Sequence, residues 1–397
     1  MENFPIVLAL ARAALANPTA AVRQHLERLH EALKANGSPE QAQAISRLLV
    51  HDERSGQIEP SRIVLSRAAL AGEAMTPSVR PPADRETAAA LAEIAHANRL
   101  GSEVPLVLND ELQPAVTSLI EEWRHLDRLR ALGVRPPLNC LLFGAPGTGK
   151  THLAHYIAGQ LGLPLVVARL DGIISSFLGT TARNIAALFE FANRYQCVLL
   201  LDEFDALAKI RDDPHEVGEI KRVVNTLLQC LDVRSDIGFT IAITNHEQLL
   251  DSAVWRRFDV RIQVPKPDFK ARLAIVQRYT APLVLTDVDR RLLAWLTHDR
   301  SGAQVQTLCN SVLRTAALNG SGEFNVADAL RLNAQLSADF KDSPRQLAMV
   351  GDPESFAQLL AADPDTGFTQ ADLAKLLKKD QSTISRWLKR NVGARSR

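Results

Sequence analysis

The strongest signal in the chain is the stretch Gly144-Ala145-Pro146-Gly147-Thr148-Gly149-Lys150-Thr151. It matches the phosphate-binding pattern G-x-x-x-x-G-K-[ST]. Residues 138–143 before it predict a buried strand, and residues 153–161 after it predict a helix. Glycines let a backbone approach phosphate closely, and the N-terminus of the helix adds positive potential. This context favours a nucleotide site over a chance Gly-rich turn, with Lys150 on the β- and γ-phosphates and Thr151 on Mg²⁺.

Composition sets the outer limits for the whole chain. Its 397 residues, 46% hydrophobic and 23% charged, are typical of a soluble globular protein with several domains. The net charge of +1 predicts no general attraction to nucleic acid or membrane, so such a partner needs a local basic patch. Without a signal peptide or a long apolar run, we expect a cytoplasmic protein and no membrane partner. The dispersed cysteines favour buried thiols over zinc or disulfides: Cys140, Cys197, Cys230 and Cys309.

The N-terminal quarter carries a helical pattern and then a proline-rich break. Val22, Leu26 and Leu29 begin an apolar stripe, which predicts a small helical bundle over residues 1–74. The stripe is either the core of that bundle or a docking groove, and the sequence leaves both open. Residues 75–84 predict a stiff linker, and an Ala-rich helix is expected from about residue 85.

Beyond the phosphate loop, apolar strands alternate with helical stretches. We expect helices at 111–132, 180–195 and 216–231, and strands at 165–170, 197–201, 239–244 and 260–264. Continuous apolar strands separated by helices predict an α/β fold with a parallel sheet covered on both faces. From 265 to 340 the pattern is helical only, which predicts a separate small domain.

Polar residues follow two of the predicted strands. Asp202 and Glu203 end one of them, at the sheet edge where the phosphate loop also lies. Asp202 is placed to help hold hydrated Mg²⁺, and Glu203 to orient or deprotonate the attacking water. Acidic residues end many strands, so the pair gains its meaning from the loop. Asn245 follows the strand 239–244 and either positions water or is an ordinary turn residue.

Arg256 and Arg257 are adjacent cations on a mixed segment. They are either an ordinary surface pair or donors to a phosphate, as arginine fingers are. Ser301-Gly302-Ala303 lies within the helical small domain.

Together these motifs resemble an AAA ATPase module over residues 104–340. The resemblance implies a P-loop large domain at 104–264, a small C-terminal helical lid at 265–340, and hydrolysis of ATP with Mg²⁺. It makes Asn245 the first sensor and assigns Arg256 and Arg257 to the neighbouring subunit's ATP, with Asp205 facing the neighbour's fingers. Ser301-Gly302-Ala303 resembles a Ser-Gly-Ala-Asp signature on the adenine side, with Gln304 in place of Asp. Nucleotide contacts are then expected from Gly144, Ala145, Pro146, Gly147, Thr148, Gly149, Lys150, Thr151, His152, Gly302 and Ala303.

Fingers that act in trans imply an oligomeric ring, most often a hexamer, and the resemblance implies that a protein client threads its pore. Phe177 and Leu178, between Ser175-Ser176 and Gly179-Thr180, are the candidate pore loop. Polar flanks favour an exposed loop, and a core phenylalanine is the alternative. A second pore loop is expected at 212–218.

Two finer resemblances concern the biological setting. Ala253-Val254-Trp255-Arg256-Arg257-Phe258 is similar to the clade of katanin, spastin and the ESCRT-disassembly ATPase. Residues 202–211 also resemble compact bacterial AAA ATPases, some of which are encoded beside a subtilisin-like serine protease and linked to antiviral defence or plasmid incompatibility. The chain has no G-x-S-x-G or H-E-x-x-H motif, so proteolysis would need a separate protease.

The C-terminal end resembles a helix-turn-helix over residues 353–397, after an expected linker at 341–352. Residues 368–377 and 382–390 predict its two helices, with Leu373, Ala374, Ile384 and Trp387 as the small core. Residues 375–397 hold eight Lys or Arg against one Asp, a local patch suited to double-stranded DNA. The residues expected to face bases are Gln381, Ser382, Thr383 and Arg386. A basic hairpin that binds protein, or is merely solvated, is the alternative.

Three hypotheses follow for the whole chain. The first is an ATPase ring that remodels or unfolds a protein client. The second is a DNA-associated regulatory ATPase anchored by the C-terminal helices. The third is a nucleotide-gated scaffold that hydrolyses ATP slowly and signals through assembly.

Overall fold

The computed structural model describes residues 72–96, 107–173, 178–206, 217–250, 252–318, 344–364 and 366–394, with a few isolated positions elsewhere. The chain divides into two compact units, Met1–Leu70 and Ala71–Arg397, and nearly all described residues belong to the second. The predicted N-terminal bundle therefore lies outside the described residues, apart from those isolated positions. Phe177, the side chain of Leu178 and most of the second candidate pore loop also lie outside them.

A six-stranded sheet forms the centre of the large domain, with strand order β1-β3-β4-β5-β2-β6. Every neighbouring pair from β3 to β6 is parallel, and β1 runs antiparallel to β3. The strands predicted from apolar runs are confirmed within about two residues. These are β2 Asn139–Phe143, β3 Leu165–Ala168, β4 Val198–Leu201, β5 Phe239–Thr244 and β6 Val260–Gln263, while β1 Ala92–Ala95 was not predicted.

Strand β1 replaces the helix expected from about residue 85, and that prediction is wrong for residues 85–96. Asp84 accepts hydrogen bonds from the amides of Glu86 and Thr87, which fold the segment into a tight turn. Its other carboxylate oxygen accepts from Asn184 at 2.7 Å, so the turn is fixed to the large domain. The backbone beyond the turn then pairs with β3. Tertiary pairing has overridden the helix propensity of alanine.

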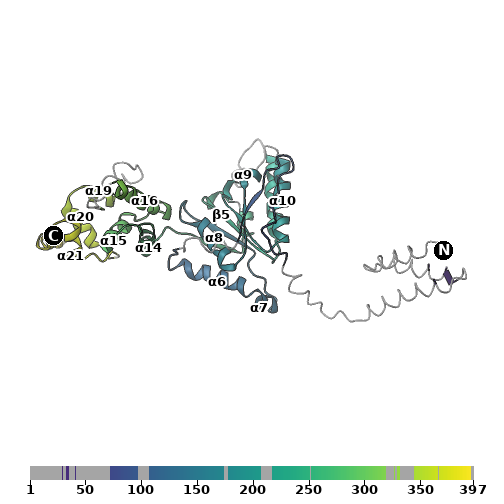
Figure 1. Ribbon diagram of the computed structural model, residues 1–397, viewed down its shortest axis with the longest axis horizontal. Coiled ribbons are helices and arrows are strands. Elements are labelled where there is room, and N and C mark those ends of the chain that lie inside the picture. Colours follow the sequence, from purple (N-terminus) through teal and green to yellow (C-terminus); the bar gives the residue numbers. More distant parts are fainter. Residues whose placement is uncertain are drawn as a thin grey trace. The chain divides into compact units, whose positions relative to one another are not determined.

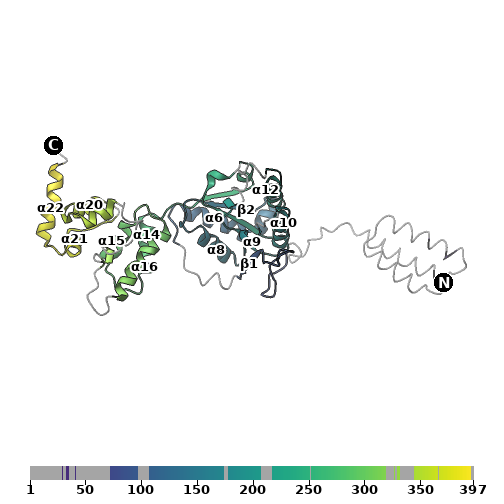
Figure 2. The same ribbon diagram turned by 90° about the horizontal axis from the view of Figure 1, so that it is seen from above.

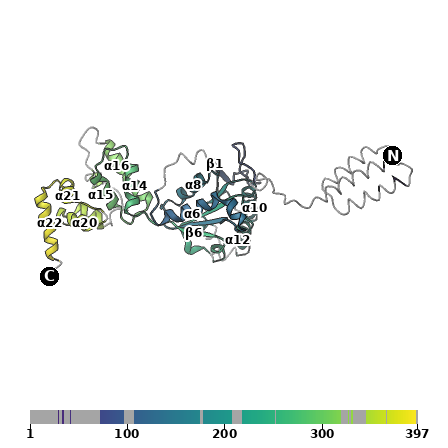
Figure 3. The same cartoon turned by 90° about the horizontal axis from the view of Figure 1, so that it is seen from below.

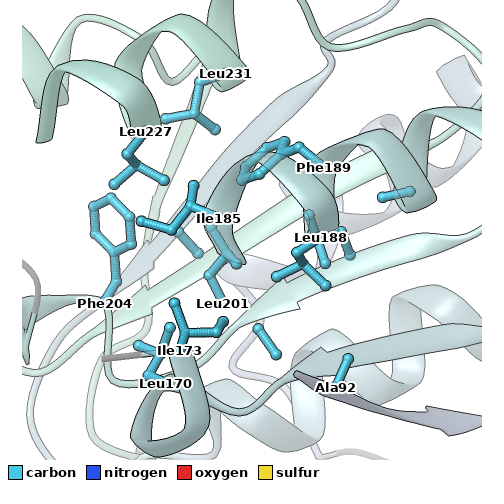
Figure 4. Packing of buried hydrophobic residues seen from close by; sticks show 14 of the residues in the cluster. Ala92, Leu170, Ile173, Ile185, Leu188, Phe189, Leu201, Phe204, Leu227 and Leu231 are labelled. Carbon is cyan, nitrogen blue, oxygen red and sulfur yellow. The ribbon is translucent and has the colours of Figure 1, made fainter. Parts of the chain in front are cut away.

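Helices cover both faces of the sheet (Figure 1). One face packs against α9 Leu170–Ile173, α10 Leu178–Arg194 and α12 Val217–Asp232. Figure 4 shows part of this core, including Ile185 and Phe189 of α10 and Leu227 and Leu231 of α12. The other face packs against α6 Leu112–Arg124 and α8 Lys150–Leu161. The single helix expected at 111–132 is two, because α6 ends at Arg124 and α7 spans Leu126–Ala131.

Two short elements, η2 Glu247–Leu249 and α13 Ser252–Trp255, connect β5 to β6. All four cysteines are free thiols, as expected; three are buried, and burial raises the pKa of Cys197 to about 11. No helix within the described ranges is long and apolar enough to cross a membrane.

After β6 every regular element in the described part of the chain is a helix. The lid contains α14 Phe269–Tyr279, α15 Asp287–Leu296 and α16 Gly302–Leu318. Four helices follow: α19 Pro344–Val350, α20 Pro353–Ala362, α21 Gln370–Leu377 and α22 Gln381–Ala394.

The linker expected at 341–352 is wrong where the structure describes it, because residues 344–350 are helical and Met349 is buried. Figures 2 and 3 show α20 and α21 beside α15. One hydrophobic core joins the lid to the C-terminal helices.

Candidate functional site

The phosphate loop leaves β2 at Phe143 and enters α8 at Lys150. Gly144, Gly147 and Gly149 have φ angles of 138°, 74° and 99°, a region that favours glycine. A Cβ on Gly144 would stand 2.5 Å from the carbonyl oxygen of Val264, so only glycine fits there. A Cβ on Gly149 would meet nothing within 4 Å. The loop is therefore packed at its base and open on the side where a phosphate would lie.

Lys150 is folded over the loop that precedes it. Its Nζ donates to the carbonyl oxygens of Gly144 and Ala145, both at 2.8 Å. The side chain is 4% exposed. Burial lowers the pKa of Lys150, and nearby carboxylates, Asp202 foremost, oppose that shift. The ammonium group is thus already held at the loop.

The end of β4 brings together the two predicted metal ligands. The hydroxyl of Thr151 donates to Asp202 Oδ2 at 2.9 Å. Two oxygen ligands of this kind fit Mg²⁺, which usually keeps water and substrate phosphate in its other positions. Among the described residues there is no larger group of metal-binding side chains.

Glu203 has a backbone conformation unusual for its residue type. Its φ is +53°, in the left-handed region that few residues other than glycine adopt. The Glu203 amide donates to Asp202 Oδ1, and the Phe204 amide donates to Ile243 of β5. Such conformations are costly and persist where surrounding contacts fix them, which occurs often at active sites.

Asn245 lies one residue beyond β5, in a turn fixed by buried hydrogen bonds. The hydroxyl of Thr244 donates to Asp205 Oδ1 at 3.2 Å and accepts from the amide of His246 at 3.0 Å. Asp205 therefore holds this turn from within the chain, whereas the family resemblance places it opposite a neighbour's arginines. The contact with Thr244 and a contact with a neighbour's arginine are compatible, because Asp205 has a second carboxylate oxygen.

A cavity of about 430 Å³ connects the phosphate loop with the lid. It has the size of a small-molecule site. The predicted residues that line it are Pro146, Gly147, Thr148, Gly149, Lys150, Thr151, His152, Asp202, Glu203, Asn245, Gly302 and Ala303. Most of the nucleotide contacts expected from the sequence thus gather in one place. Gly144 and Ala145 instead contribute the carbonyl groups that hold Lys150.

Six further cavity residues were not predicted: Val107, Ile243, Ile275, Arg278, Tyr279 and Gln306. Three of them lie on α14 at spacings of three and one, which places them on one helix face. That spacing was visible in the sequence. It cannot distinguish a helix face that lines a cavity from one that lines a core.

The lid touches the phosphate loop at the start of α16. The amide of Ala303 donates to the carbonyl oxygen of Gly147 at 3.0 Å. A Cβ on Gly147 would stand 2.8 Å from Ser301 Oγ, so the contact is close. Gln304 accepts from the Ser301 amide at 2.9 Å through Oε1. Gln304 therefore caps α16, although it replaces the Asp of the family signature.

Arg256 and Arg257 do not line the cavity. The guanidinium of Arg257 makes two contacts with Asp232 at the end of α12, at 2.9 and 3.1 Å. The side chain of Asn139 donates to the carbonyls of Leu231 and Arg257, which fixes the same segment to β2. Arg256 is exposed and makes no side-chain hydrogen bond or ion pair with the part of the chain that the structure describes.

The two helices predicted at 368–377 and 382–390 are present, as α21 and α22. Helices α21 and α22 are joined by a three-residue turn in which Lys378 has a φ of +52°. Leu373 and Ile384 are fully buried, and Ala374 and Trp387 pack against them. Of the residues predicted to face DNA, three are exposed and Thr383 is half-buried: Gln381, Ser382 and Arg386 are the exposed ones.

Residues 140–266 match the family described as "ATPase family associated with various cellular activities (AAA)". This segment is therefore similar to an AAA ATPase domain. The chain is 45% identical over 163 residues to an uncharacterized AAA family ATPase, y4kL, of Sinorhizobium fredii, which covers 41% of this chain and 49% of that protein.

Relatives named ATP-dependent zinc metalloprotease FtsH also match. The protein of Rhodothermus marinus is 34% identical over 228 residues, covering 55% of this chain and 33% of the relative. That of Aquifex aeolicus is 33% identical over 228 residues, covering 55% and 36%. The chain thus spans less than half the length of the curated relatives it matches.

Proposed function

We propose that this chain hydrolyses ATP in the cavity beneath its lid and, as a ring of subunits, uses the reaction to remodel or unfold a protein client. The observation that carries the proposal is the convergence of Lys150, the Thr151–Asp202 pair, Glu203 and Asn245 on one cavity. The AAA match over residues 140–266 supports ATP hydrolysis in general. The FtsH relatives, named as ATP-dependent proteases, support work on protein substrates.

The residues divide the reaction between them. Amides of the phosphate loop and Lys150 would bind the β- and γ-phosphates. Thr151 and Asp202 would hold Mg²⁺, whose charge offsets that of the phosphates. Glu203 would take a proton from water as the water oxygen bonds to the γ-phosphorus, while Asn245 orients it. The bond from that phosphorus to the bridging oxygen breaks, and ADP and phosphate leave.

A neighbouring subunit would complete the site. Neither Arg256 nor Arg257 lines the cavity of its own chain, although phosphoryl transfer benefits from an arginine at the transferred group. A ring in which these residues reach the next subunit's ATP accounts for both facts. The family resemblance favours six subunits, with Phe177 and Leu178 on the pore loop that grips the client.

One experiment separates remodelling from hydrolysis. Phe177→Ala should leave ATP turnover within about twofold of wild type and abolish ATP-dependent unfolding of a bound client, measured with a fluorescent client. Client identification would use Glu203→Gln as a trap that retains ATP. Unfolding that survives Phe177→Ala would contradict the threading proposal while leaving ATP hydrolysis standing.

The finer setting is part of the same proposal. No zinc-protease or serine-protease motif occurs within the 397 residues, and we propose a separate protease, such as the subtilisin-like type, for any proteolytic outcome. The resemblance to bacterial defence ATPases suggests such a pairing in the cytoplasm. Recovery of a protease with the Glu203→Gln trap would support it, and a client set without any protease would count against it.

A second candidate function is a regulatory ATPase anchored to DNA. The observation that favours it is the exposed basic surface of α21 and α22, where Lys378, Lys379 and Arg386 all face solvent. The slow nucleotide-gated scaffold, the third hypothesis, has no observation of its own in its favour. A turnover rate that depends on client but not on duplex DNA would favour remodelling over both.

A further inference from the structure

The C-terminal helices are not attached to the lid by a free hinge. Lid residues Val276, Leu293 and Val305 belong to the same buried core as Leu373 of α21 and Ile384 of α22. Trp295 of α15 meets Phe356 of α20 edge to face, with ring centroids 5.8 Å apart. Closely packed cores of this kind resist sliding of one helix past another. The lid helices and the C-terminal helices therefore move together as one rigid body.

Two arginines add polar contacts between the lid helices and the C-terminal helices. Arg291 of α15 donates to the carbonyls of Thr366 and Gly367 at 3.1 and 3.0 Å, and to Asp372 Oδ2 at 3.2 Å. Its guanidinium also lies 5.0 Å from the ring centre of Phe368.

Arg345 of α19 makes the second set. It donates to the carbonyl of Trp295 and to Asp363 Oδ2, both at 2.9 Å, while the Trp295 indole donates to the same carboxylate at 3.0 Å. These groups are mostly shielded from solvent, where such bonds contribute more than exposed ones.

The outer surface of α21 and α22 is positively charged. We define the basic face by its five exposed cations, which are Lys375, Lys378, Lys379, Arg386 and Lys389. Asp380 is the one acidic residue between positions 373 and 394. Asp372, just before them, is bound to Arg291 and is largely buried. With one exposed carboxylate, Asp380, among five exposed cations, the face keeps a net positive charge for an anionic partner.

The same body forms one wall of the nucleotide cavity. Ile275 and Tyr279 of α14 line the cavity, and Ala303 of α16 is hydrogen-bonded to Gly147 of the phosphate loop. A ligand in the cavity would touch both the loop and the lid, and would favour the angle between them at which both contacts form. Because the lid and the basic face share a core, that change is carried to the basic face.

We propose that the basic face binds the phosphate backbone of duplex DNA and that the nucleotide cavity controls this binding through the rigid lid. The inference rests on the second candidate function for its partner and on the proposed ATP site for its control. By thermodynamic reciprocity, duplex DNA must also change the affinity of the cavity for nucleotide by the same factor.

Duplex DNA fits the face better than an acidic protein segment does. Helix α22 is 14 residues long, or about 21 Å, and presents Ser382, Arg386 and Lys389 at spacings of four and three along one side. Gln381 and Ser382 stand exposed at its first turn, which is the part of a recognition helix that enters the major groove. Cations at the turn and along the helix lie where phosphates flank that groove.

The first experiment measures binding of the full chain to a 20-base-pair duplex over a range of salt concentrations. Arg386→Ala with Lys389→Ala should weaken binding about tenfold or more, and should lower the salt dependence by about two counterions. Arg314→Ala is the matched control, because it removes an exposed cation of the same body on α16. If the double variant and the control bind the duplex with equal affinity, the proposed DNA surface is wrong. It is also wrong if polyglutamate displaces the bound duplex as effectively as unlabelled duplex does.

Removal of residues 365–397 would be a poor test, because it takes Leu373 and Ile384 out of the lid core. Point changes on the exposed face avoid that difficulty. ATP turnover of the double variant without DNA should match wild type, which separates a lost surface from a damaged lid.

The second experiment tests control by nucleotide. Duplex affinity is measured for the Glu203→Gln chain with ATP, with ADP and without nucleotide, at concentrations where sedimentation shows one subunit. We expect at least a fivefold difference between two of these states. Arg291→Gln, which loosens the contact to Asp372 and Gly367, should retain duplex binding and reduce that difference.

Each failure has its own signature. Duplex binding that is equal in all three states, with nucleotide affinity unaffected by duplex, overturns the control and leaves the surface intact. Normal ATP turnover without any duplex binding overturns the surface and leaves the proposed ATPase intact. Duplex binding by a wild-type chain that never hydrolyses ATP would instead contradict the proposed function.

Discussion

The phosphate loop and the segment around Arg256 are both tightly fixed, yet they direct their charges differently. At the loop, Lys150, Asp202 and Glu203 converge on one cavity. In the other segment, Arg257 is bound to Asp232 of its own chain, and Arg256 faces solvent. The difference agrees with the proposed ring, in which each subunit binds ATP at its own phosphate loop and offers its arginines to the ATP of the next subunit.

The largest effect is expected from Glu203→Gln. If Glu203 accepts the proton from water as proposed, its loss should lower turnover by about a thousandfold, within the usual range for general bases. ATP affinity should change little, because the phosphate contacts remain. Steady-state hydrolysis and equilibrium binding of a fluorescent ATP analogue measure the two quantities.

Glu247→Gln is the matched control for that change. Glu247 is a carboxylate near Lys150 that does not line the cavity. Its turnover should stay within about threefold of wild type. Comparable losses from both changes would show that charge near Lys150, rather than proton transfer at Glu203, limits the reaction.

The next effect concerns the segment around Arg256, which does not line the cavity of its own chain. Arg256→Ala should lower turnover about a hundredfold, the cost of removing one donor to the transferring phosphate. Mixing Arg256→Ala subunits with Lys150→Ala subunits should restore part of the activity, because some neighbouring pairs then combine an intact loop with an intact arginine. Turnover against mixing ratio measures the recovery. A flat profile at every ratio would show that the two regions do not meet across subunits.

Sequence patterns were sufficient to predict the conformation of the phosphate loop, but they did not predict the contacts of the two arginines. The loop depends on local geometry, in which glycines, a preceding strand and a following helix fix one another within some 20 residues. The ion pair between Arg257 and Asp232 joins α12 to a segment after α13, and no local pattern encodes it. Residues 85–96 show the same limit, since alanines that favour a helix form a turn and an edge strand instead.

The lid illustrates a further limit of sequence patterns. A proline-containing stretch near 344–353 predicted a linker, but Pro344 and Pro353 occupy the first positions of helices α19 and α20. The shared core of the lid and the C-terminal helices depends on contacts between distant residues such as Trp295 and Phe356. Hydrophobic periodicity identifies the helices and does not reveal which of them pack together.

A smaller effect is expected from Asp232→Asn. The change leaves Arg257 without its charged partner, and exposed pairs of this kind contribute about 1 kcal/mol or less. Stability should therefore fall only slightly, and ATP affinity of the isolated subunit should not change. Turnover of the assembled form should shift by a few fold, because Arg257 can then move.

Asp236→Asn, which loses the pair with Arg130, is the control. Identical turnover in both variants would assign Asp232 no role in positioning Arg257.

The smallest effect on turnover is expected at Asp84, which lies in neither region. The hydrogen bond from Asn184, with others from the turn, lowers the pKa of Asp84 from 3.8 to about 2. A carboxyl group whose pKa is lowered by folding stabilises the fold above its unfolded pKa, and this contribution is lost as the pH falls from about 4 to 2. Asp84→Ala should therefore lower the melting temperature at pH 7 and reduce its dependence on pH below 4, measured by circular dichroism.

ATP turnover of the folded variant should match wild type, since Asp84 anchors β1 and α10 rather than the cavity. A melting temperature unchanged at pH 7 would mean that the Asn184 contact does not hold this edge of the sheet.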